Sequence, residues 1–129
     1  MNAWPYCPHL LTGNAPQAIE RHMDILARLE ETIAERRSAD PEASYVAQLH
    51  QRGLPVMARK LGEEATEAVV AALSGTSEEL TGEAADVLFH LLVLLSAKNI
   101  ALDDVLGELA RREGLSGLDE KAARQEGDA

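Results

Sequence analysis

Hydrophobic residues recur at helical spacing in several segments of the chain. Between residues 16 and 37 they follow one another at intervals of three and four, with charged residues between them. The same pattern covers 54–73 and 76–98, and shorter helical segments are predicted over 41–53 and 103–112. We therefore predict an all-α fold, a helical bundle of about five helices.

Residues that favour turns and helix caps mark the ends of these segments. Asp40 followed by Pro41 predicts the start of the short second helix, with the aspartate as its N-cap. Thr76 and Glu79 have the spacing of a capping box at the start of the fourth helix. The third and fourth helices are long enough to pair as an antiparallel hairpin.

The chain is expected to form one domain. Residues 1–22 are predicted to be an N-terminal arm and the start of the first helix, because prolines and Gly13 interrupt any periodicity before residue 16. Residues 23–124 are predicted to form the helical domain, and 125–129 a disordered tail. The length of 129 residues suits a single hydrophobic core.

The amino-acid composition narrows the classes of function that the protein can have. Hydrophobic residues make up 46% of the chain but aromatic residues only 3%, so the core must be aliphatic. With 12 basic and 22 acidic residues the formal charge is −10, which argues against nucleic acids and anionic membranes as partners. The single cysteine, Cys7, fits a reducing compartment, and His90 interrupts the longest hydrophobic run. We therefore expect a cytoplasmic protein with no membrane span.

Four acidic residues on the two long helices form the strongest candidate for chemistry. Glu64 and Glu67 are three residues apart on the third helix, and Glu83 and Asp86 are three apart on the fourth. Residues at this spacing project from the same helix face. The fourth helix is hydrophobic on nearly every side, and among its central residues only Asp86 and His90 are polar, in line with Glu83.

Buried carboxylates are costly unless they are paired or bind a cation. Oxygen ligands favour Mg²⁺ or Mn²⁺ over Zn²⁺, so the four carboxylates predict a divalent metal site. The competing interpretation is an ordinary solvated acidic face, which a single Glu-x-x-Glu pair would indicate by itself. We expect His90 to support the metal ligands from behind and not to be a ligand itself. Lys60 is either a surface charge or a phosphate contact.

These residues resemble those of a known family. The acidic pairs are similar to those of the MazG-like all-α nucleotide pyrophosphohydrolases, and more closely to the phosphoribosyl-ATP pyrophosphohydrolases of histidine biosynthesis. The resemblance runs from about Leu26 to Arg124 and rests on five segments, which are Ser44-Tyr45, Lys60–Glu67, Glu83–Leu95, Asp104–Leu109 and Ser116–Arg124. It implies Mg²⁺-dependent hydrolysis of phosphoribosyl-ATP to phosphoribosyl-AMP and pyrophosphate.

The resemblance also implies roles for individual residues. It makes the metal ligands Glu64, Glu67, Glu83 and Asp86, whereas Glu63 is implied as a further ligand or as the residue that positions water. Candidate phosphate and substrate contacts are Lys60, Arg111, Arg112 and Lys121.

The hydrophobic fourth helix predicts a homodimer, because a single small bundle could hardly cover it. Two other functions stay open. One is a house-cleaning pyrophosphohydrolase that acts on free or damaged nucleoside triphosphates with the same carboxylates. The other is a non-catalytic acidic adaptor, whose carboxylates bind a basic protein and no metal.

Overall fold

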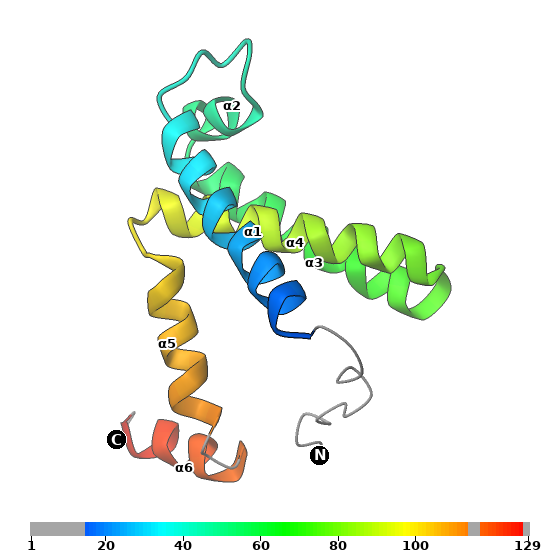
Figure 1. The fold of residues 1–129 in the computed structure, drawn as a ribbon, viewed down its shortest axis with the longest axis vertical. Helices are drawn as coiled ribbons and strands as arrows, with labels where there is room; N and C mark the ends of the chain where they lie inside the picture. The colour runs from blue at the N-terminus through cyan, green and yellow to red at the C-terminus, as the bar shows by residue number, and fades with distance from the viewer. Residues whose placement is uncertain (1–14, 114–116, 128–129) are drawn as a thin grey trace. The chain divides into compact units, whose positions relative to one another are not determined.

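The structure, a computed structural model, describes residues 15–113 and 117–127, and side chains from residue 25 onward except at 117, 118 and 120. The predicted arm before residue 15, with Cys7, and the turn that contains Ser116 lie outside the described residues. All regular structure within the described ranges is helical, which confirms the all-α prediction. The helices are α1 (Ala15–Arg36), α2 (Tyr45–Arg52), α3 (Leu54–Ser74), α4 (Ser77–Ala97), α5 (Leu102–Glu113) and α6 (Gly117–Gly127) (Figure 1).

Helix α6 brings the number in the described residues to six, where about five were expected. It includes residues 125–127, which the sequence analysis assigned to a disordered tail. The physical reason is composition, because Glu, Lys, Ala, Arg and Gln are all good helix formers and no proline interrupts them.

The turn between α3 and α4 forms as its sequence predicts. The Thr76 side chain accepts a hydrogen bond from the Glu79 backbone N–H at 3.1 Å, and the Thr76 N–H donates to the Glu79 carboxylate at 2.6 Å. Gly75 is needed before this capping box. A Cβ atom there would lie 2.9 Å from the Ala71 carbonyl oxygen, closer than real Cβ atoms come. The turn is therefore tight enough to return α4 directly along α3.

The predicted start of α2 is wrong by four residues. Asp40 does cap a backbone N–H, but that of Glu42 at 2.9 Å, which closes a local turn instead of opening a helix. The helix begins at Tyr45, where the buried Ser44 hydroxyl accepts from the Ala47 N–H at 3.3 Å. Asp40 and Ser44 are thus alternative caps for α2. The helix begins after Ser44, because that start lets α2 bury its hydrophobic face.

The described chain divides into two compact units, although the sequence predicted one domain over 23–124. One unit is Met23–Leu102, which contains most of α1 together with α2, α3 and α4. The other comprises, among the described residues, 15–22, 103–113 and 117–127, and so includes all of α6 and nearly all of α5. The candidate carboxylates all lie in the first unit.

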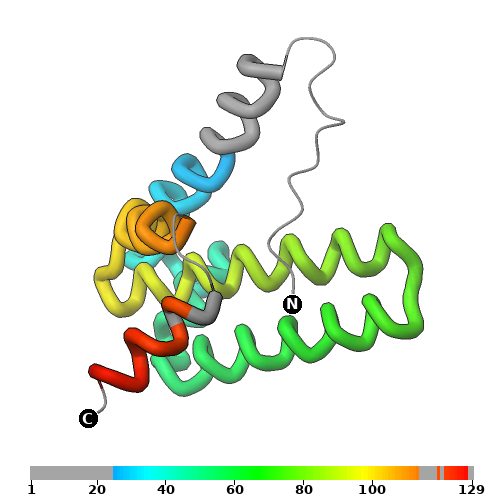
Figure 2. Tube along the Cα trace, turned by 90° about the horizontal axis from the view of Figure 1, so that it is seen from below, coloured from blue at the N-terminus to red at the C-terminus, as the bar shows by residue number. Residues whose placement is uncertain are grey.

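Helices α3 and α4 form the antiparallel hairpin that the sequence predicts (Figures 1 and 2). Helices α1 and α2 lie near the start of α3 and the end of α4, and the hydrophobic core forms there. Its buried members are aliphatic, as composition requires; they are Ile33, Val46, Leu49, Met57, Leu92 and Val93. The opposite end of the hairpin extends away from this core.

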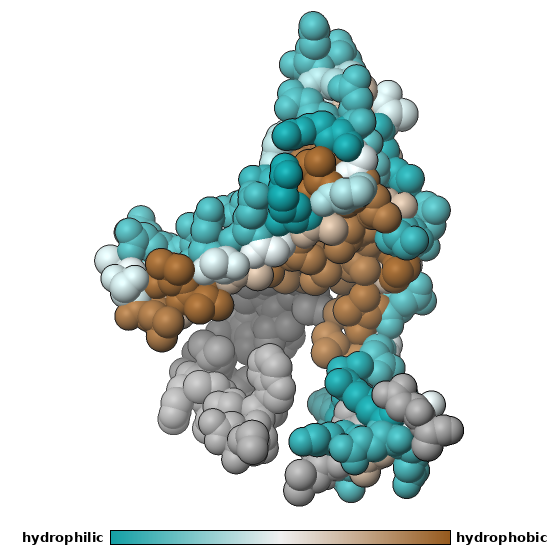
Figure 3. Space-filling model, turned by 180° about the vertical axis from the view of Figure 1, so that it is seen from behind, coloured by the Kyte–Doolittle hydropathy of each residue, from teal (hydrophilic) through white to brown (hydrophobic). Residues whose placement is uncertain are grey.

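Much of the hydrophobic surface of the hairpin stays exposed in the single chain. Val69 is 58% exposed and Leu73 is 84% exposed on α3, and Leu88 is 47% exposed on α4. In the space-filling view, hydrophobic atoms run along the hairpin to its free end (Figure 3). The buried residues of α4 are confined to His90, Leu92 and Val93, among those described.

By length and composition alone, α4 is the one helix among the described residues that meets the criteria for a membrane span. This is weak evidence, because a core helix of a protein assembly meets the same criteria. Glu83 and Asp86 lie within α4, and carboxylates are expensive in the hydrocarbon of a bilayer. We interpret its hydrophobic residues as protein-packing surface.

A carboxylate from α1 caps the start of α5. Ala101 cannot cap this helix with its side chain, and the Glu30 carboxylate instead accepts a hydrogen bond from the Leu102 N–H at 2.5 Å. Arg37, also from the α1 region, donates to the Ser96 carbonyl oxygen at 3.0 Å and to the Asn99 side chain at 3.2 Å. The connection after α4 is thus fixed by residues from about sixty to seventy positions earlier in the chain.

Replacing Glu30 by alanine is expected to lower the free energy of unfolding by about 1–2 kcal/mol, the usual cost of losing a helix cap or a charged hydrogen bond. Urea titration followed by circular dichroism measures the difference. The control is Glu31→Ala, which makes the same change at an exposed position of the same helix. Equal stability of the two variants would show that the cap contributes nothing.

Candidate functional site

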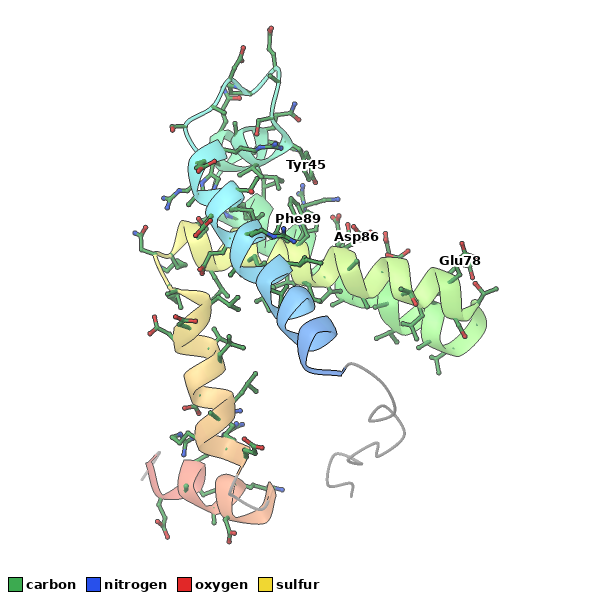
Figure 4. All side chains as sticks on the ribbon, in the orientation of Figure 1. Tyr45, Glu78, Asp86 and Phe89 are labelled. Carbon is green, nitrogen blue, oxygen red and sulfur yellow. The ribbon has the colours of Figure 1, made fainter. Side chains whose placement is uncertain are left out.

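Three of the predicted carboxylates converge between α3 and α4. Ligand oxygens of Glu64, Glu83 and Asp86 all lie within 4.8 Å of one another. Glu64 comes from α3, and the other two come from successive turns of α4, so the hairpin itself brings them together. Figure 4 shows Asp86 near the middle of α4, on the hairpin. We refer to these three residues as the carboxylate cluster.

Glu67 adjoins the cluster without being one of its three members. Its carboxylate lies near both Glu64 and Glu83, because its charge contributes to the raised pKa of each. The four predicted acidic side chains therefore lie in one region of the hairpin.

Burial affects the pKa of two of these carboxyl groups, Glu64 and Glu83. The Glu64 side chain is only 12% exposed, and burial followed by the charges of Glu67 and Asp86 raises its pKa. Burial likewise raises the pKa of Glu83, and the neighbouring Glu67 adds to the effect. The Glu83 Oε2 atom is buried with no hydrogen-bond partner in the described structure. A buried carboxylate oxygen without a donor fits a site that binds a cation.

Glu63 faces a different set of charges. Lys60 donates to its carboxylate at 3.1 Å, and Arg59 lies 3.4 Å from it. The hydrogen bond from Lys60, with its positive charge, lowers the pKa of Glu63. The Glu63 side chain is 46% exposed and is not a member of the carboxylate cluster.

Lys60 lies at the edge of the cluster. Besides Glu63, its ammonium group is 3.8 Å from the Glu64 carboxylate, and the hydrogen bond to Glu63 raises its pKa. The side chain is 27% exposed. A cation in this position is accessible to a ligand that binds at the cluster.

His90 packs directly behind Glu64. Its Nε2 atom is 3.8 Å from the Glu64 carboxylate, beyond hydrogen-bond distance, and its side chain is 6% exposed. Burial lowers the pKa of His90, which favours the neutral ring. The Nδ1 atom is buried without a hydrogen-bond partner in the described structure. The ring therefore supports the back of the cluster rather than supplying a charge to it.

The other predicted substrate contacts lie in the second unit. Arg111 donates two hydrogen bonds to the Glu108 carboxylate, at 2.8 and 2.7 Å, and Arg112 donates a third at 2.8 Å. These bonds lower the pKa of Glu108 to about 2. Lys121 is exposed on α6. Their relation to the carboxylate cluster stays a prediction.

Tyr45 is close to the cluster, although it was expected only as part of a segment that carries the family resemblance and no role at the site was predicted for it. Its ring stacks on Phe89, with centroids 6.2 Å apart and planes at 17°, and meets the edge of His90 at 6.0 Å. Two signals were available, the Ser44-Tyr45 segment of the resemblance and the scarcity of aromatic residues, since the chain contains only one Phe, one Trp and two Tyr residues. Two aromatic residues beside the same histidine are notable in such a chain.

Comparison with known proteins gives consistent matches. A family model described as phosphoribosyl-ATP pyrophosphohydrolase matches residues 26–113. The chain is similar to a phosphoribosyl-ATP pyrophosphatase of Erythrobacter litoralis, with 68% identity over 102 residues, which cover 79% of this chain and 98% of the relative. It is also similar to the phosphoribosyl-ATP pyrophosphatase of Novosphingobium aromaticivorans, at 64% identity over 80% of this chain and 96% of the relative.

Proposed function

This chain belongs to the phosphoribosyl-ATP pyrophosphohydrolase family, and from that premise we propose that Glu64, Glu67, Glu83 and Asp86 hold Mg²⁺ for its reaction. The chain is a hydrolase that converts phosphoribosyl-ATP to phosphoribosyl-AMP and pyrophosphate in histidine biosynthesis. The observation that best supports the metal proposal is the convergence of three carboxylates, one with a buried oxygen that has no donor.

The residues fit a hard divalent cation because all the donors are carboxylate oxygens. The chemistry that Mg²⁺ supplies when bound is positive charge for the phosphate oxygens and a lowered pKa for a bound water. The protein itself contributes the rigid hairpin that holds the donors, and Lys60 at the edge as a phosphate contact. Such a contact matters because the chain carries a net charge of −10 that repels a triphosphate.

Glu67 is the better candidate than Glu63 for orienting the attacking water. Glu63 already accepts a hydrogen bond from Lys60 and lies 3.4 Å from Arg59. The charge of Glu67 raises the pKa of Glu64 and Glu83, so its carboxylate lies beside the proposed metal site, where the reaction is proposed to occur. Arg111, Arg112 and Lys121 are proposed as further substrate contacts on the family resemblance alone.

The test is pyrophosphate release from phosphoribosyl-ATP with Mg²⁺, run beside ATP and dUTP and repeated with EDTA. We expect release from phosphoribosyl-ATP alone, and only with the metal. Preference for ATP or dUTP would instead support the house-cleaning function. Inertness towards all three, with no stabilisation by Mg²⁺, would support the acidic adaptor.

We further propose that the protein is a homodimer that works in the cytoplasm, without nucleic-acid or membrane partners. The exposed hydrophobic side chains of α3 and α4 support a second copy as the partner, because soluble monomers rarely leave such surface uncovered. A closed two-fold assembly is the commonest way to cover such a face with identical chains.

Light scattering after size exclusion at micromolar concentration is expected to give about twice the chain mass of 13.9 kDa. Val69→Glu on α3 is expected to yield monomer, because it places a charge in the proposed interface. The matched control is Leu109→Glu on α5, since Leu109 is 56% exposed and Val69 is 58% exposed. A monomeric unmodified protein would contradict the dimer.

A further inference from the structure

Tyr45 combines exposure with a fixed position. It is the first residue of α2, whose start is held by the buried Ser44 hydroxyl. Tyr45 is 46% exposed, although its ring stacks on Phe89 of α4. The core is built from aliphatic side chains, so packing does not require a tyrosine here.

The tyrosine ring is linked to the carboxylate cluster through His90. Tyr45 meets the edge of the histidine ring at 6.0 Å, and His90 Nε2 is 3.8 Å from the Glu64 carboxylate. Figure 4 shows Tyr45 beside Phe89, with Asp86 farther along α4. An exposed aromatic ring thus lies near the cluster but outside it.

This placement suits a ligand that has an anionic part and a flat aromatic part. In a nucleoside triphosphate the ribose separates the base from the phosphates, so a base site must be near the phosphate site without coinciding with it. Purine bases stack on aromatic side chains, with little demand on hydrogen bonding. Phe89 and His90 behind Tyr45 restrict the tyrosine ring, which lowers the entropy cost of stacking.

We propose that Tyr45, supported by Phe89, is the platform on which the purine base of the substrate stacks. The inference rests on the proposed function for the phosphate chemistry, and adds the residue that recognises the base. Tyr45 is then a specificity-determining residue, which contributes to binding of phosphoribosyl-ATP and nothing to binding of the phosphate chain alone.

The experiment compares Tyr45→Ala and Tyr45→Leu with Tyr45→Phe, which keeps the stacking face. Loss of stacking is expected to raise KM for phosphoribosyl-ATP about 5- to 150-fold in the first two variants, with a smaller change in kcat. Tyr45→Phe is expected to stay within about twofold of the unmodified protein, because the hydroxyl is not needed for stacking. Tyr45→Leu still covers Phe89, so it separates stacking from packing if Tyr45→Ala folds poorly.

Inorganic tripolyphosphate, which has phosphates and no base, is the discriminating probe. Its inhibition constant is expected to be the same in all three variants and the unmodified protein. If the inhibition constant of tripolyphosphate rose by the same factor as KM for phosphoribosyl-ATP, the proposal would be overturned, since the substitution would then have distorted the phosphate site. An unchanged KM in Tyr45→Leu would overturn it as well. Failure of the unmodified protein to act on phosphoribosyl-ATP would instead reject the proposed function.

Discussion

Replacing Glu64 by glutamine is expected to abolish pyrophosphate release from phosphoribosyl-ATP while the helical fold persists. Glu64 is the α3 member of the carboxylate cluster in the described structure, so its loss removes one of the two proposed ligands on that side and leaves only Glu67 there. Replacing a residue that merely supports a metal ligand typically lowers metal affinity or activity about 10- to 100-fold. We therefore expect replacement of a direct ligand to lower activity by more than about 100-fold. Asp86→Asn is expected to have the same effect from α4.

The matched control is Glu78→Gln, which removes the same charge from an exposed position in the first turn of α4 (Figure 4). It is expected to keep full activity. Thermal unfolding gives a second readout, because Mg²⁺ should raise the Tm of the unmodified protein and of Glu78→Gln but not of Glu64→Gln. In EDTA, Glu64→Gln is expected to be at least as stable as the unmodified protein, since one of several repelling charges is gone. Full activity in Glu64→Gln would remove the metal site from the mechanism.

Leu49→Ala is expected to lower the free energy of unfolding by about 2–5 kcal/mol. Leu49 is 0% exposed and belongs to the core cluster, where α2 packs on the rest of the bundle. The substitution removes buried hydrophobic surface and leaves a cavity. This loss is a large fraction of the total free energy of unfolding of a small domain, which is about 5–15 kcal/mol. Helix α2 also carries Tyr45, so activity should fall as the helix loosens.

Urea denaturation followed by circular dichroism measures the effect of Leu49→Ala. Leu54→Ala is the matched control, because the same atoms are removed from a residue that is 40% exposed at the start of α3. We expect that control to cost about 1 kcal/mol or less. Similar losses in the two variants would show that the burial of Leu49 does not determine its contribution.

Local signals in the sequence were sufficient for the hairpin. The capping box at Thr76 and the spacing of the acidic pairs depend on neighbours within one or two turns, so they are readable from the chain alone. At 100° per residue, helical spacing places Glu64 only at the edge of the hydrophobic face of α3, which includes Ala65. In the structure Glu64 is nearly buried while Ala65 is exposed. The contact with α4 selects which stripe of α3 is covered, and periodicity alone does not.

Features that depend on long-range packing were missed. The start of α2 at Tyr45 instead of Pro41 reflects a competition between two local caps that tertiary burial decides. The position of Tyr45 against Phe89 joins residues from different helices, so neither helical periodicity nor motif spacing predicts it. The cap at Leu102 shows the same limit, because its acceptor, Glu30, lies 72 residues earlier.

That cap has a consequence for the order in which the chain folds. The α3–α4 hairpin is closed by neighbouring residues, and its loop-closure cost is small, so it can form early. The Leu102 N–H at the start of α5 gains its hydrogen bond only when α1 has docked and brought Glu30 to Leu102. In a folding intermediate that has the hairpin but not yet the docked α1, the Leu102 amide therefore has no hydrogen bond to Glu30 and exchanges freely with solvent. Hydrogen exchange at this single amide would report the docking of α1 separately from the formation of the hairpin.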